Sequence, residues 1–414
     1  MINKHKLSNG ITVVTEYLPH VASVAMGVWI KAGAVDENSN SGISHFIEHM
    51  MFKGTSDRTY KMIAEDIEKL GGNINAFTGK ECTCYYIKAL SSNFDKNIDV
   101  LIDILTNSVF DENEMEKEKG VIIEEMKMIE DVPDDYGHDL ITSAIFTGSP
   151  LGNSIIGTRE SVTAINRDDI VSFISQRYTP DTVLISCVGK FDEDALLAKL
   201  EEGFAGIVGS TNKREYNCTP NEPIRNSLTR DIEQTHLFIG KKGLPLDHEN
   251  LMALNLYSSI LGGGMSSRLF SSVREEQGLA YSVFSMDSAF VNDGQFLIYA
   301  GVSDDKLLTA LKAIKDEIVK LAQTKVPEDE LAKVKEQYKG AYIFRRESNS
   351  SKMFEYGRNM LLLDKIYSEE EILSKMDSVT IDDIMLMAEK FADFSEYSSI
   401  IISSKDTDIS DLLS

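Results

Sequence analysis

Three polar residues in one short segment have the types and spacing that metal chemistry needs. His45 and His49 are four residues apart, and Glu48 directly precedes the second histidine. In a helix, residues three and four positions apart share a face, so the two imidazoles can hold one zinc ion. The Glu48 carboxylate can then reach a water bound to that ion. This His-x-x-Glu-His order is the inverse of the zincin helix motif. For these five residues alone, a solvated helix face that binds no metal stays open as an alternative.

The apolar residues around this motif predict the helix that must position it. They recur at i, i+3, i+4, i+7 and i+8, which is typical of a stripe that faces a protein core. These residues are Ile43, Phe46, Ile47, Met50 and Met51. The three motif residues fall on the opposite side of the same helix.

A second predicted helix places carboxylates on an apolar face. Asp111 has the type of an N-cap residue and opens a helix that extends to about residue 130. Two glutamates and two isoleucines share one stripe of it, in the order Glu118, Ile122, Glu125 and Ile129. A buried carboxylate needs a partner, and a divalent cation would provide one for the nearer group. Glu124 points about 100° away, so we expect it to be solvated. The alternative is a helix that turns its acidic residues outward at a frayed end.

Length, charge and cysteine content limit the classes of protein to which the chain can belong. The chain has 414 residues, enough for two or three domains, and its formal net charge of −24 opposes nucleic-acid backbones. Four cysteines cannot form a dense disulfide framework, which favours a reducing compartment. These are Cys82, Cys84, Cys187 and Cys218. Residues 1–20 contain no apolar signal core, and no later run reaches membrane-spanning length. We therefore expect a cytoplasmic protein with no membrane span and no nucleic-acid partner.

The second half of the chain repeats the first in outline. The segment Phe110–Met115 recurs as Val326–Leu331, and Asp168-Asp169-Ile170 recurs as Asp382-Asp383-Ile384 at nearly the same offset. The copies differ chemically, because Ala341 stands where Glu125 would recur and no second His-x-x-Glu-His exists. We predict a zinc-binding repeat at 1–206, a linker at 207–228 and a second repeat without zinc ligands at 229–414.

Strand signals surround the predicted helices. Asn9-Gly10 between two alternating segments is a strong hairpin signal, and Val21 to Ala32 alternates like another strand. Asn73 to Thr78 and Glu81 to Ile87, joined by a Gly79-Lys80 turn, indicate a second hairpin. We expect an α+β fold of two related domains, each a mainly antiparallel sheet faced by helices.

With these residues in view, the sequence resembles the pitrilysin and mitochondrial processing peptidase family of zinc metallopeptidases. That family's third zinc ligand is a glutamate at the distance from the second histidine at which Glu125 stands, and a glutamate seven positions earlier supports the site, where Glu118 stands. The resemblance covers nearly the whole chain, including the segments His45 to Thr55 and Gly72 to Thr78. It implies one zinc ion per chain, held by His45, His49 and Glu125, with a water in the fourth position.

The resemblance also implies roles for residues outside the metal motif. Arg274 and Tyr281 are seven residues apart, as are an arginine and a tyrosine that meet substrate near the metal in the family. Without the resemblance they are an exposed helix arginine and a tyrosine at a strand start. Asn75, Ala76 and Phe77 match the family's edge strand, onto which substrate adds by backbone hydrogen bonds. An ordinary sheet strand is the compatible alternative.

The expected reaction is endopeptidase cleavage of an extended peptide. Glu48 would remove a proton from the water and pass it to the leaving amine, while Arg274 and Tyr281 would stabilise the oxyanion. In the mitochondrial processing peptidases, acidic residues at the positions of Asp135 and Asp139 receive an arginine just before the cleavage site. A solvated acidic loop is the alternative for these two residues.

The resemblance implies a partner as well. Family members of this length pair into a clam-like chamber, so we expect a homodimer with active sites shared between subunits. Two other readings stay open. One is a non-catalytic or structural partner of the same fold, and the other is a zinc hydrolase of small non-peptide substrates.

Overall fold

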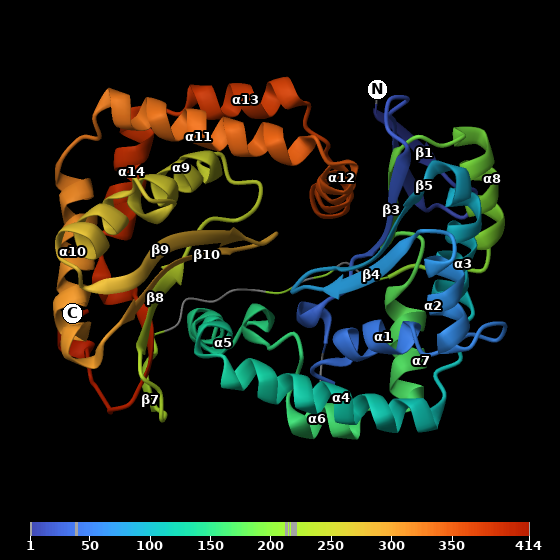
Figure 1. Cartoon of the computed structure of the whole chain (residues 1–414), viewed down its shortest axis with the longest axis horizontal. Coiled ribbons are helices and arrows are strands. Elements are labelled where there is room, and N and C mark those ends of the chain that lie inside the picture. The colour runs from blue at the N-terminus through green and yellow to red at the C-terminus, as the bar shows by residue number, and fades with distance from the viewer. Residues whose placement is uncertain (1, 38–39, 212–213, 215, 217–221, 414) are drawn as a thin grey trace. The chain divides into compact units, whose positions relative to one another are not determined.

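The chain forms two compact units, each made of three segments. The computed structural model describes residues 2–37, 40–211, 214, 216 and 222–413. Unit 1 contains Met1–Met126, Asn153–Glu215 and Ile343–Ile366, and unit 2 contains Lys127–Gly152, Tyr216–Tyr342 and Tyr367–Ser414 (Figure 1). Much of the predicted linker, residues 212–213, 215 and 217–221, lies outside the described residues, and Cys218 lies there too.

Unit 1 is built on a six-stranded sheet in the order β1-β2-β6-β3-β5-β4. Its strands are β1 (Ile2–Lys6), β2 (Thr12–Tyr17), β3 (Ser23–Ile30), β4 (Asn73–Thr78), β5 (Thr83–Leu90) and β6 (Val183–Gly189). Among these described strands, β2 and β6 form the only parallel pair. The predicted hairpin at Asn9-Gly10 is confirmed, because β1 and β2 pair antiparallel on either side of it. The strand β4 lies at the edge of the sheet.

Within the part of the chain that the structure describes, unit 2 repeats this sheet without a counterpart of β1. Its strands are β7 (Arg225–Thr229), β8 (Thr235–Lys242), β9 (Ala280–Ala289), β10 (Gly294–Val302) and β11 (Ser398–Ser403). Their order is β7-β11-β8-β10-β9, with β7 parallel to β11 and the other pairs antiparallel. In this order the five strands correspond to β2, β6, β3, β5 and β4 of unit 1, and each pair of neighbours has the same relative direction as its counterpart. The expected fold of two related, mainly antiparallel sheets is therefore confirmed.

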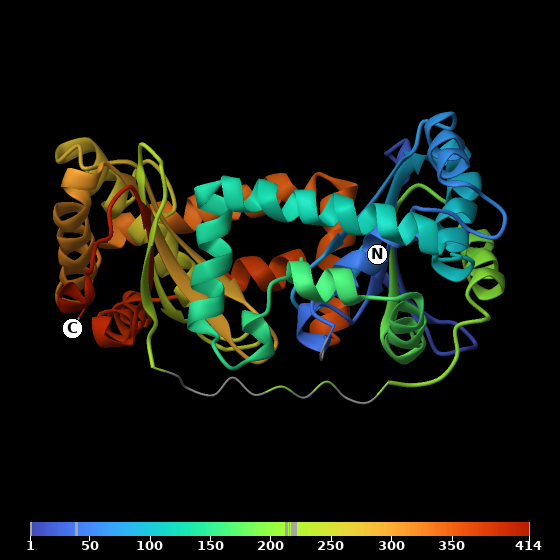
Figure 2. The same ribbon diagram turned by 90° about the horizontal axis from the view of Figure 1, so that it is seen from below.

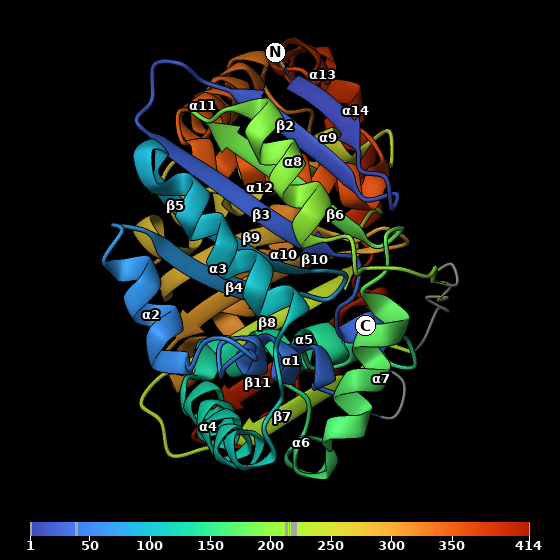
Figure 3. The ribbon, with the colours of Figure 1, turned by 90° about the vertical axis from the view of Figure 1, so that its right-hand side faces the viewer.

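Helices cover both faces of the sheet in unit 1. The helices that lie wholly in this unit are α1 (Ile43–Met51), α2 (Tyr60–Glu68), α3 (Phe94–Thr106), α6 (Arg159–Ala164), α7 (Arg167–Arg177), α8 (Glu193–Gly203) and α12 (Asn349–Leu363). The helices α3 and α8 lie on one face, and α12 packs on β3 and β6 from the other (Figures 1 and 3). Every residue of β6 is buried, as expected for a strand covered on both faces.

Unit 2 is layered in the same way. Its helices include α5 (Pro133–Ile145), α9 (Leu251–Gly262), α10 (Leu307–Gln323), α13 (Glu369–Ser378) and α14 (Ile381–Phe391). The helix α5 packs on β8 and β11, while α10 and α14 lie on the opposite face of the sheet (Figure 2). The apolar core of the unit lies between the sheet and α9, α10 and α14.

One helix of each half packs in the unit formed mainly by the other half. The chain changes units within α4 (Glu112–Asp131) after Met126, and at the equivalent point of the repeat within α11 (Glu328–Arg346) after Tyr342. It returns after Gly152 and, again at the equivalent point, after Ile366. The changes of unit thus follow the sequence repeat. The compact units differ from the predicted continuous segments 1–206 and 229–414 by the exchange of α5 and α12.

A glycine allows each exchanged helix to lie close to its sheet. A Cβ atom on Gly357 of α12 would lie 2.0 Å from Nε1 of Trp29, and one on Gly137 of α5 would lie 2.1 Å from the ring of Phe238. Any side chain at either position would force the helix away from a large, fully buried aromatic residue. The exchange is therefore specified by sequence at both contacts. Among the described residues, no helix has both the length and the apolar composition needed to cross a membrane.

Candidate metal centre

The predicted motif helix is present as α1, and its two sides differ as expected. Its apolar stripe is buried, from Ile43 to Met51, while His45, Glu48 and His49 are half-buried on the other side. The helix begins after Gly42, whose φ of 87° requires a residue without a side chain. Core packing therefore fixes the helix, and the motif residues remain accessible on one side.

The side chains of His45, His49 and Glu125 converge in unit 1. Nε2 of His45 lies 3.9 Å from Oε1 of Glu125, and Nε2 of His49 lies 3.6 Å from Oε2. One ligand atom from each of the three lies within 4.8 Å of the others. Zinc held tetrahedrally by such atoms separates them by about 3.4 Å, so only small side-chain movements are needed. Two imidazoles and one carboxylate are also the donor set of zinc sites that keep one position open.

Glu118 contacts His49 through Nδ1, the ring nitrogen that does not face Glu125. Oε2 of Glu118 lies 3.0 Å from Nδ1 of His49, and the ammonium group of Lys53 lies 2.6 Å from Oε1. Burial opposes ionisation of Glu118, but the contacts with His49 and Lys53 outweigh it and lower the pKa of the carboxyl. Because a carboxylate only accepts, the proton between them belongs to Nδ1 of His49. The lone pair of Nε2 is then directed at the metal position.

His45 is prepared for metal binding in a different way. Burial, together with the nearby His49, lowers the pKa of His45 to about 4. The ring is therefore neutral at pH 7, which is the state that binds zinc. Its Nδ1 atom is buried and makes no hydrogen bond within the part of the chain that the structure describes.

Glu48 has the environment of a general base. Burial raises the pKa of Glu48, and the Thr78 hydroxyl donates a hydrogen bond to its carboxylate. A raised pKa brings a carboxylate closer to the pH at which it can exchange protons with water. Thr78 is the last residue of β4, so the base and the edge strand are joined directly. Glu124 is exposed, as predicted for the glutamate next to Glu125.

The expected substrate strand is an edge strand in the structure. Asn75, Ala76 and Phe77 lie in β4, whose one partner among the described strands is β5. The Phe77 ring lies 5.7 Å from the ring of Trp29 and 5.9 Å from the ring of Phe354, measured between centroids. Phe77 thus anchors β4 to β3 and α12, while the outer backbone edge of β4 remains available for pairing.

Arg274 and Tyr281 lie together in unit 2. Arg274 is on η4 (Phe270–Glu276), a π-helix of a kind that is rare and frequent at functional sites. Its guanidinium lies 4.6 Å from the centre of the Phe270 ring and 5.4 Å from that of the Tyr281 ring. Tyr281 is 78% exposed at the start of β9 and lines a cavity of about 500 Å³ at the end of the sheet. The two side chains therefore form one cation–π pair.

Asp135 and Asp139 also belong to unit 2. They lie four residues apart on α5 and so share a side of that helix, with Asp135 exposed and Asp139 half-buried. Their neighbour Asp134 anchors the helix, because its carboxylate lies 2.6 Å from Nδ1 of His236 and accepts a hydrogen bond from Tyr299. Unit 1 by itself thus assembles the three candidate metal ligands, Glu48 and β4, and unit 2 carries the remaining predicted residues.

The sequence did not reveal Lys53 and Thr78 as parts of this centre. Both lie inside segments that carry the family resemblance. Lys53 lies just after the end of α1, four residues beyond His49, and both side chains contact Glu118. No local pattern connects Thr78 to Glu48, because the two residues lie on different elements.

Comparison with known proteins identifies the family of this chain. Residues 12–159 match the model of the insulinase family, peptidase family M16, and residues 164–338 match the model of the M16 peptidase inactive domain. An uncharacterized zinc protease of Bacillus subtilis, YmxG, is 40% identical over 390 residues, which are 92% of this chain and 93% of that protein. The chain therefore belongs to peptidase family M16, and the resemblance to inverted-motif zinc peptidases is confirmed.

Solved structures share the fold. The crystal structure of a peptidase M16 inactive domain from Pseudomonas fluorescens superposes with a TM-score of 0.92 at 17% identity, covering 98% of both chains. A protease from Helicobacter pylori gives a TM-score of 0.90 at 22% identity, covering 97% of this chain and 99% of that one. At these identities the likeness establishes the fold alone.

Proposed function

We propose that this member of family M16 is a zinc endopeptidase that hydrolyses extended or unfolded peptides. The observation that carries the proposal is the convergence of the Nε2 atoms of His45 and His49 on the Glu125 carboxylate, with Glu48 on the same helix. The names of its relatives as zinc proteases support the same class of activity.

Each residue has one task in this reaction. His45, His49 and Glu125 would hold one zinc ion, which supplies a Lewis acid and lowers the pKa of a bound water to about 7. Glu48 accepts the proton of the attacking water and delivers it to the leaving amine. Thr78 keeps the Glu48 carboxylate oriented through its hydrogen bond.

Preference for extended peptides follows from β4. A peptide that pairs with the outer edge of this strand satisfies its backbone groups by main-chain hydrogen bonds, which recognise chain conformation more than side chains. In a folded protein most backbone groups are already paired, so extended or unfolded segments are the better substrates. The edge position of β4 and the anchoring of Phe77 support this part of the proposal.

A preference for arginine near the cleaved bond is the second element of specificity. Asp135 and Asp139 share one side of α5. A substrate guanidinium between two carboxylates would form charge-assisted hydrogen bonds with both. Asp134 contacts His236, so we assign the binding of the substrate guanidinium to Asp135 and Asp139 alone.

We further propose that the protein acts in the cytoplasm as a homodimer. Among the described cysteines, Cys82, Cys84 and Cys187 are free and buried, as expected in a reducing compartment. In the dimer, Arg274 and Tyr281 of the partner subunit would stabilise the oxyanion formed in the unit 1 site. Their cation–π pairing supports a joint role.

Hydrolysis of unfolded peptides and of small esters, measured side by side with and without a chelator, tests the proposal. We expect chelator-sensitive cleavage of peptides and little ester hydrolysis. Preferential ester hydrolysis would favour a non-peptide hydrolase, and absence of both activities would favour a non-catalytic partner of the same fold.

A further inference from the structure

The loop before the metal helix carries a buried carboxyl that caps it. Oε2 of Glu37 accepts a hydrogen bond of 2.6 Å from the backbone N–H of Gly42, and Oε1 accepts one of 2.9 Å from Ser44. Glu37 is almost fully buried. Both N–H groups lie in the first turn of α1, where no intrahelical acceptor exists. The residue after Ser44 is His45, so this cap fixes the end of the helix that carries the first metal ligand.

The same loop is fixed to the turn that follows β4. The N–H of Ala34 donates to the carbonyl of Gly79 at 3.2 Å, and that of Val35 donates to the carbonyl of Lys80 at 2.9 Å. A Cβ atom at Gly33 would lie only 2.4 Å from the oxygen of Gly79, so the two segments are in closest contact there. Residues 33–37 therefore join the start of α1 to the end of β4, which supplies Thr78 to Glu48.

Arg214, a residue of the predicted linker at 207–228, makes hydrogen bonds to this junction. Arg214 Nε donates to Oδ1 of Asp36 at 3.0 Å, and its Nη2 donates to the carbonyls of Lys31 at 3.1 Å and of Glu81 at 2.7 Å. The Arg214 side chain is 9% exposed and that of Asp36 is 1% exposed. Asp36 also accepts from the N–H of Gly33 at 3.0 Å. One guanidinium thus bonds at once to the residue that follows β3, to the loop and to the turn.

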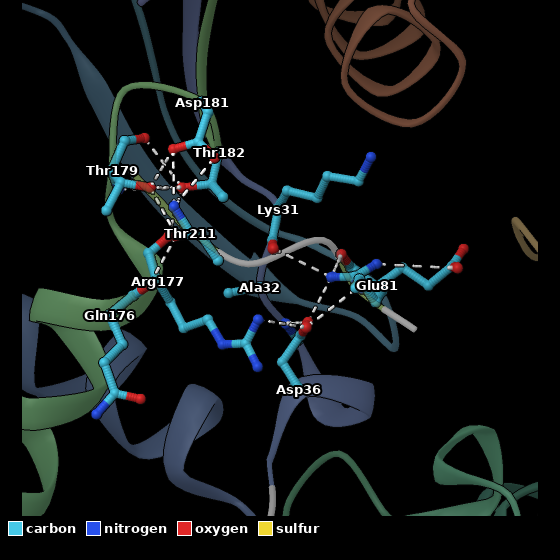
Figure 4. A network of polar contacts seen from close by, with 12 residues as sticks. Lys31, Ala32, Asp36, Glu81, Gln176, Arg177, Thr179, Asp181, Thr182 and Thr211 are labelled. Atoms are coloured by element: carbon cyan, nitrogen blue, oxygen red, sulfur yellow. Dashed lines mark hydrogen bonds and ion pairs between the residues drawn. The ribbon is translucent and has the colours of Figure 1, made fainter. Parts of the chain in front are cut away.

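A second described residue of the predicted linker, Thr211, is also hydrogen-bonded to unit 1. The Thr211 hydroxyl donates to the carbonyl of Gln176 at 2.6 Å, and its N–H donates to the carboxylate of Asp181. Figure 4 shows Thr211 among Thr179, Asp181 and Thr182, beside the cluster around Asp36. Arg177 also approaches Asp36, with Nη1 3.3 Å from Oδ1. Charge at Asp36 is therefore shared by two arginines, and Arg214 also bonds to the residue after β3 and to the turn after β4.

We propose that Arg214 is a positioning residue for the metal centre, acting through Asp36 and the Glu37 cap on the helix that carries His45, Glu48 and His49. The proposal rests on the proposed function, because it assumes that these residues bind zinc. The proposal gives the predicted linker a role beyond joining the two halves, because its residue Arg214 supports the unit 1 site.

The full-length protein with Arg214→Met tests this role. Methionine keeps the aliphatic volume and removes every donor, while Arg177 remains to neutralise Asp36. Arg346→Met is the matched control, because Arg346 is also 9% exposed in unit 1 and pairs with a carboxylate, that of Glu355, at 2.8 Å. The readouts are zinc dissociation constants from competition with a chromophoric chelator, the visible spectrum of the Co²⁺-substituted protein, and urea unfolding.

We expect Arg214→Met to raise the zinc dissociation constant by about tenfold or more and to change the Co²⁺ spectrum. Arg346→Met should leave both unchanged, even where its unfolding midpoint falls equally. Equal effects of the two substitutions, or zinc binding by Arg214→Met as tight as in wild type, would overturn the role of Arg214.

Arg214→Lys covers the case in which the methionine variant does not fold. A lysine keeps the charge beside Asp36 but cannot bond to two carbonyls and a carboxylate in the geometry of a guanidinium. Its zinc dissociation constant should be raised, and a wild-type value would contradict the proposal. Failure of the wild-type protein to bind zinc would instead overturn the proposed function, so the two failures are distinguishable.

Discussion

Nδ1 of His49 lies 3.0 Å from Oε2 of Glu118, a carboxylate that is itself paired with Lys53. This contact fixes both the tautomer and the orientation of one proposed zinc ligand through a residue that is not itself a proposed ligand. It links the two helices α1 and α4, which lie far apart in the sequence and each carry an apolar stripe.

Glu118→Gln should weaken zinc binding without removing a ligand. The amide can accept from Nδ1 of His49 through one oxygen only, and its NH₂ group faces the ammonium of Lys53 or the imidazole unfavourably. We expect the zinc dissociation constant to rise by about 10- to 100-fold. Glu124→Gln is the control, since Glu124 is exposed on the same helix. If Glu124→Gln weakened zinc binding as much as Glu118→Gln does, the orientation assigned to α4 would be wrong.

Stability should depend on pH through Glu37. Burial raises the pKa of Glu37 from 4.5 to about 7, although the hydrogen bonds from Gly42 and Ser44 oppose this shift. Between pH 4.5 and 7 the folded state therefore binds more protons than the unfolded state, so this contribution to stability is present at low pH and is lost as pH rises through 7. Its size is on the order of 3 kcal/mol.

Urea unfolding of wild type and Glu37→Gln at pH 5, 6, 7 and 8 measures this contribution. Glutamine cannot ionise, so we expect the stability of wild type to fall relative to the variant over this range. Other titrating groups are common to both proteins and cancel in the difference. A difference that stays constant with pH would show that Glu37 does not titrate there.

Arginine recognition by Asp135 and Asp139 predicts sensitivity to side-chain charge. Peptides with arginine before the cleaved bond should lose kcat/KM when citrulline replaces the arginine, because citrulline keeps the shape and removes the positive charge. The doubly substituted Asp135→Asn/Asp139→Asn protein should lose most of this discrimination. Equal cleavage of both peptides by wild type, or an undiminished preference in the double variant, would exclude this specificity.

Sharing of sites between subunits predicts recovery of activity on mixing two inactive variants. In a dimer of one His49→Ala chain and one Tyr281→Phe chain, one shared site carries both substitutions and the other carries neither. Random pairing makes about half of the dimers mixed, so about a quarter of wild-type activity should return. Subunit exchange must first be verified by mass spectrometry. Activity that stays at the level of the separate variants after exchange contradicts sharing.

Local patterns in the sequence were sufficient for the parts of the site that one helix determines. The apolar stripe from Ile43 to Met51 defined α1, and the stripe through Glu118 and Glu125 defined the side of α4 that faces the motif. In both cases the helical period relates sequence directly to a helix face. The spacing of the ligands therefore could be read before their positions were known.

Contacts between distant segments could not be read in this way. Periodicity shows which side of α5 and α12 is apolar, but not which sheet covers it, so their exchange between units was missed. The Glu37 cap and the Arg214 contacts depend on where loops return in space. The π-helix that carries Arg274 was likewise not predicted, because a single π-helical segment depends on hydrogen-bond register and not on a pattern of residue types.

Zinc content together with peptide cleavage, measured for wild type, Glu48→Gln and Glu125→Gln, tests the central claim most directly. Glu48 is proposed as a base and not a ligand, whereas Glu125 is proposed as a ligand. We expect one zinc ion per chain and cleavage in wild type, retained zinc without turnover in Glu48→Gln, and loss of zinc affinity in Glu125→Gln. Equal loss of metal in both variants, or cleavage by Glu48→Gln at the wild-type rate, would contradict the account.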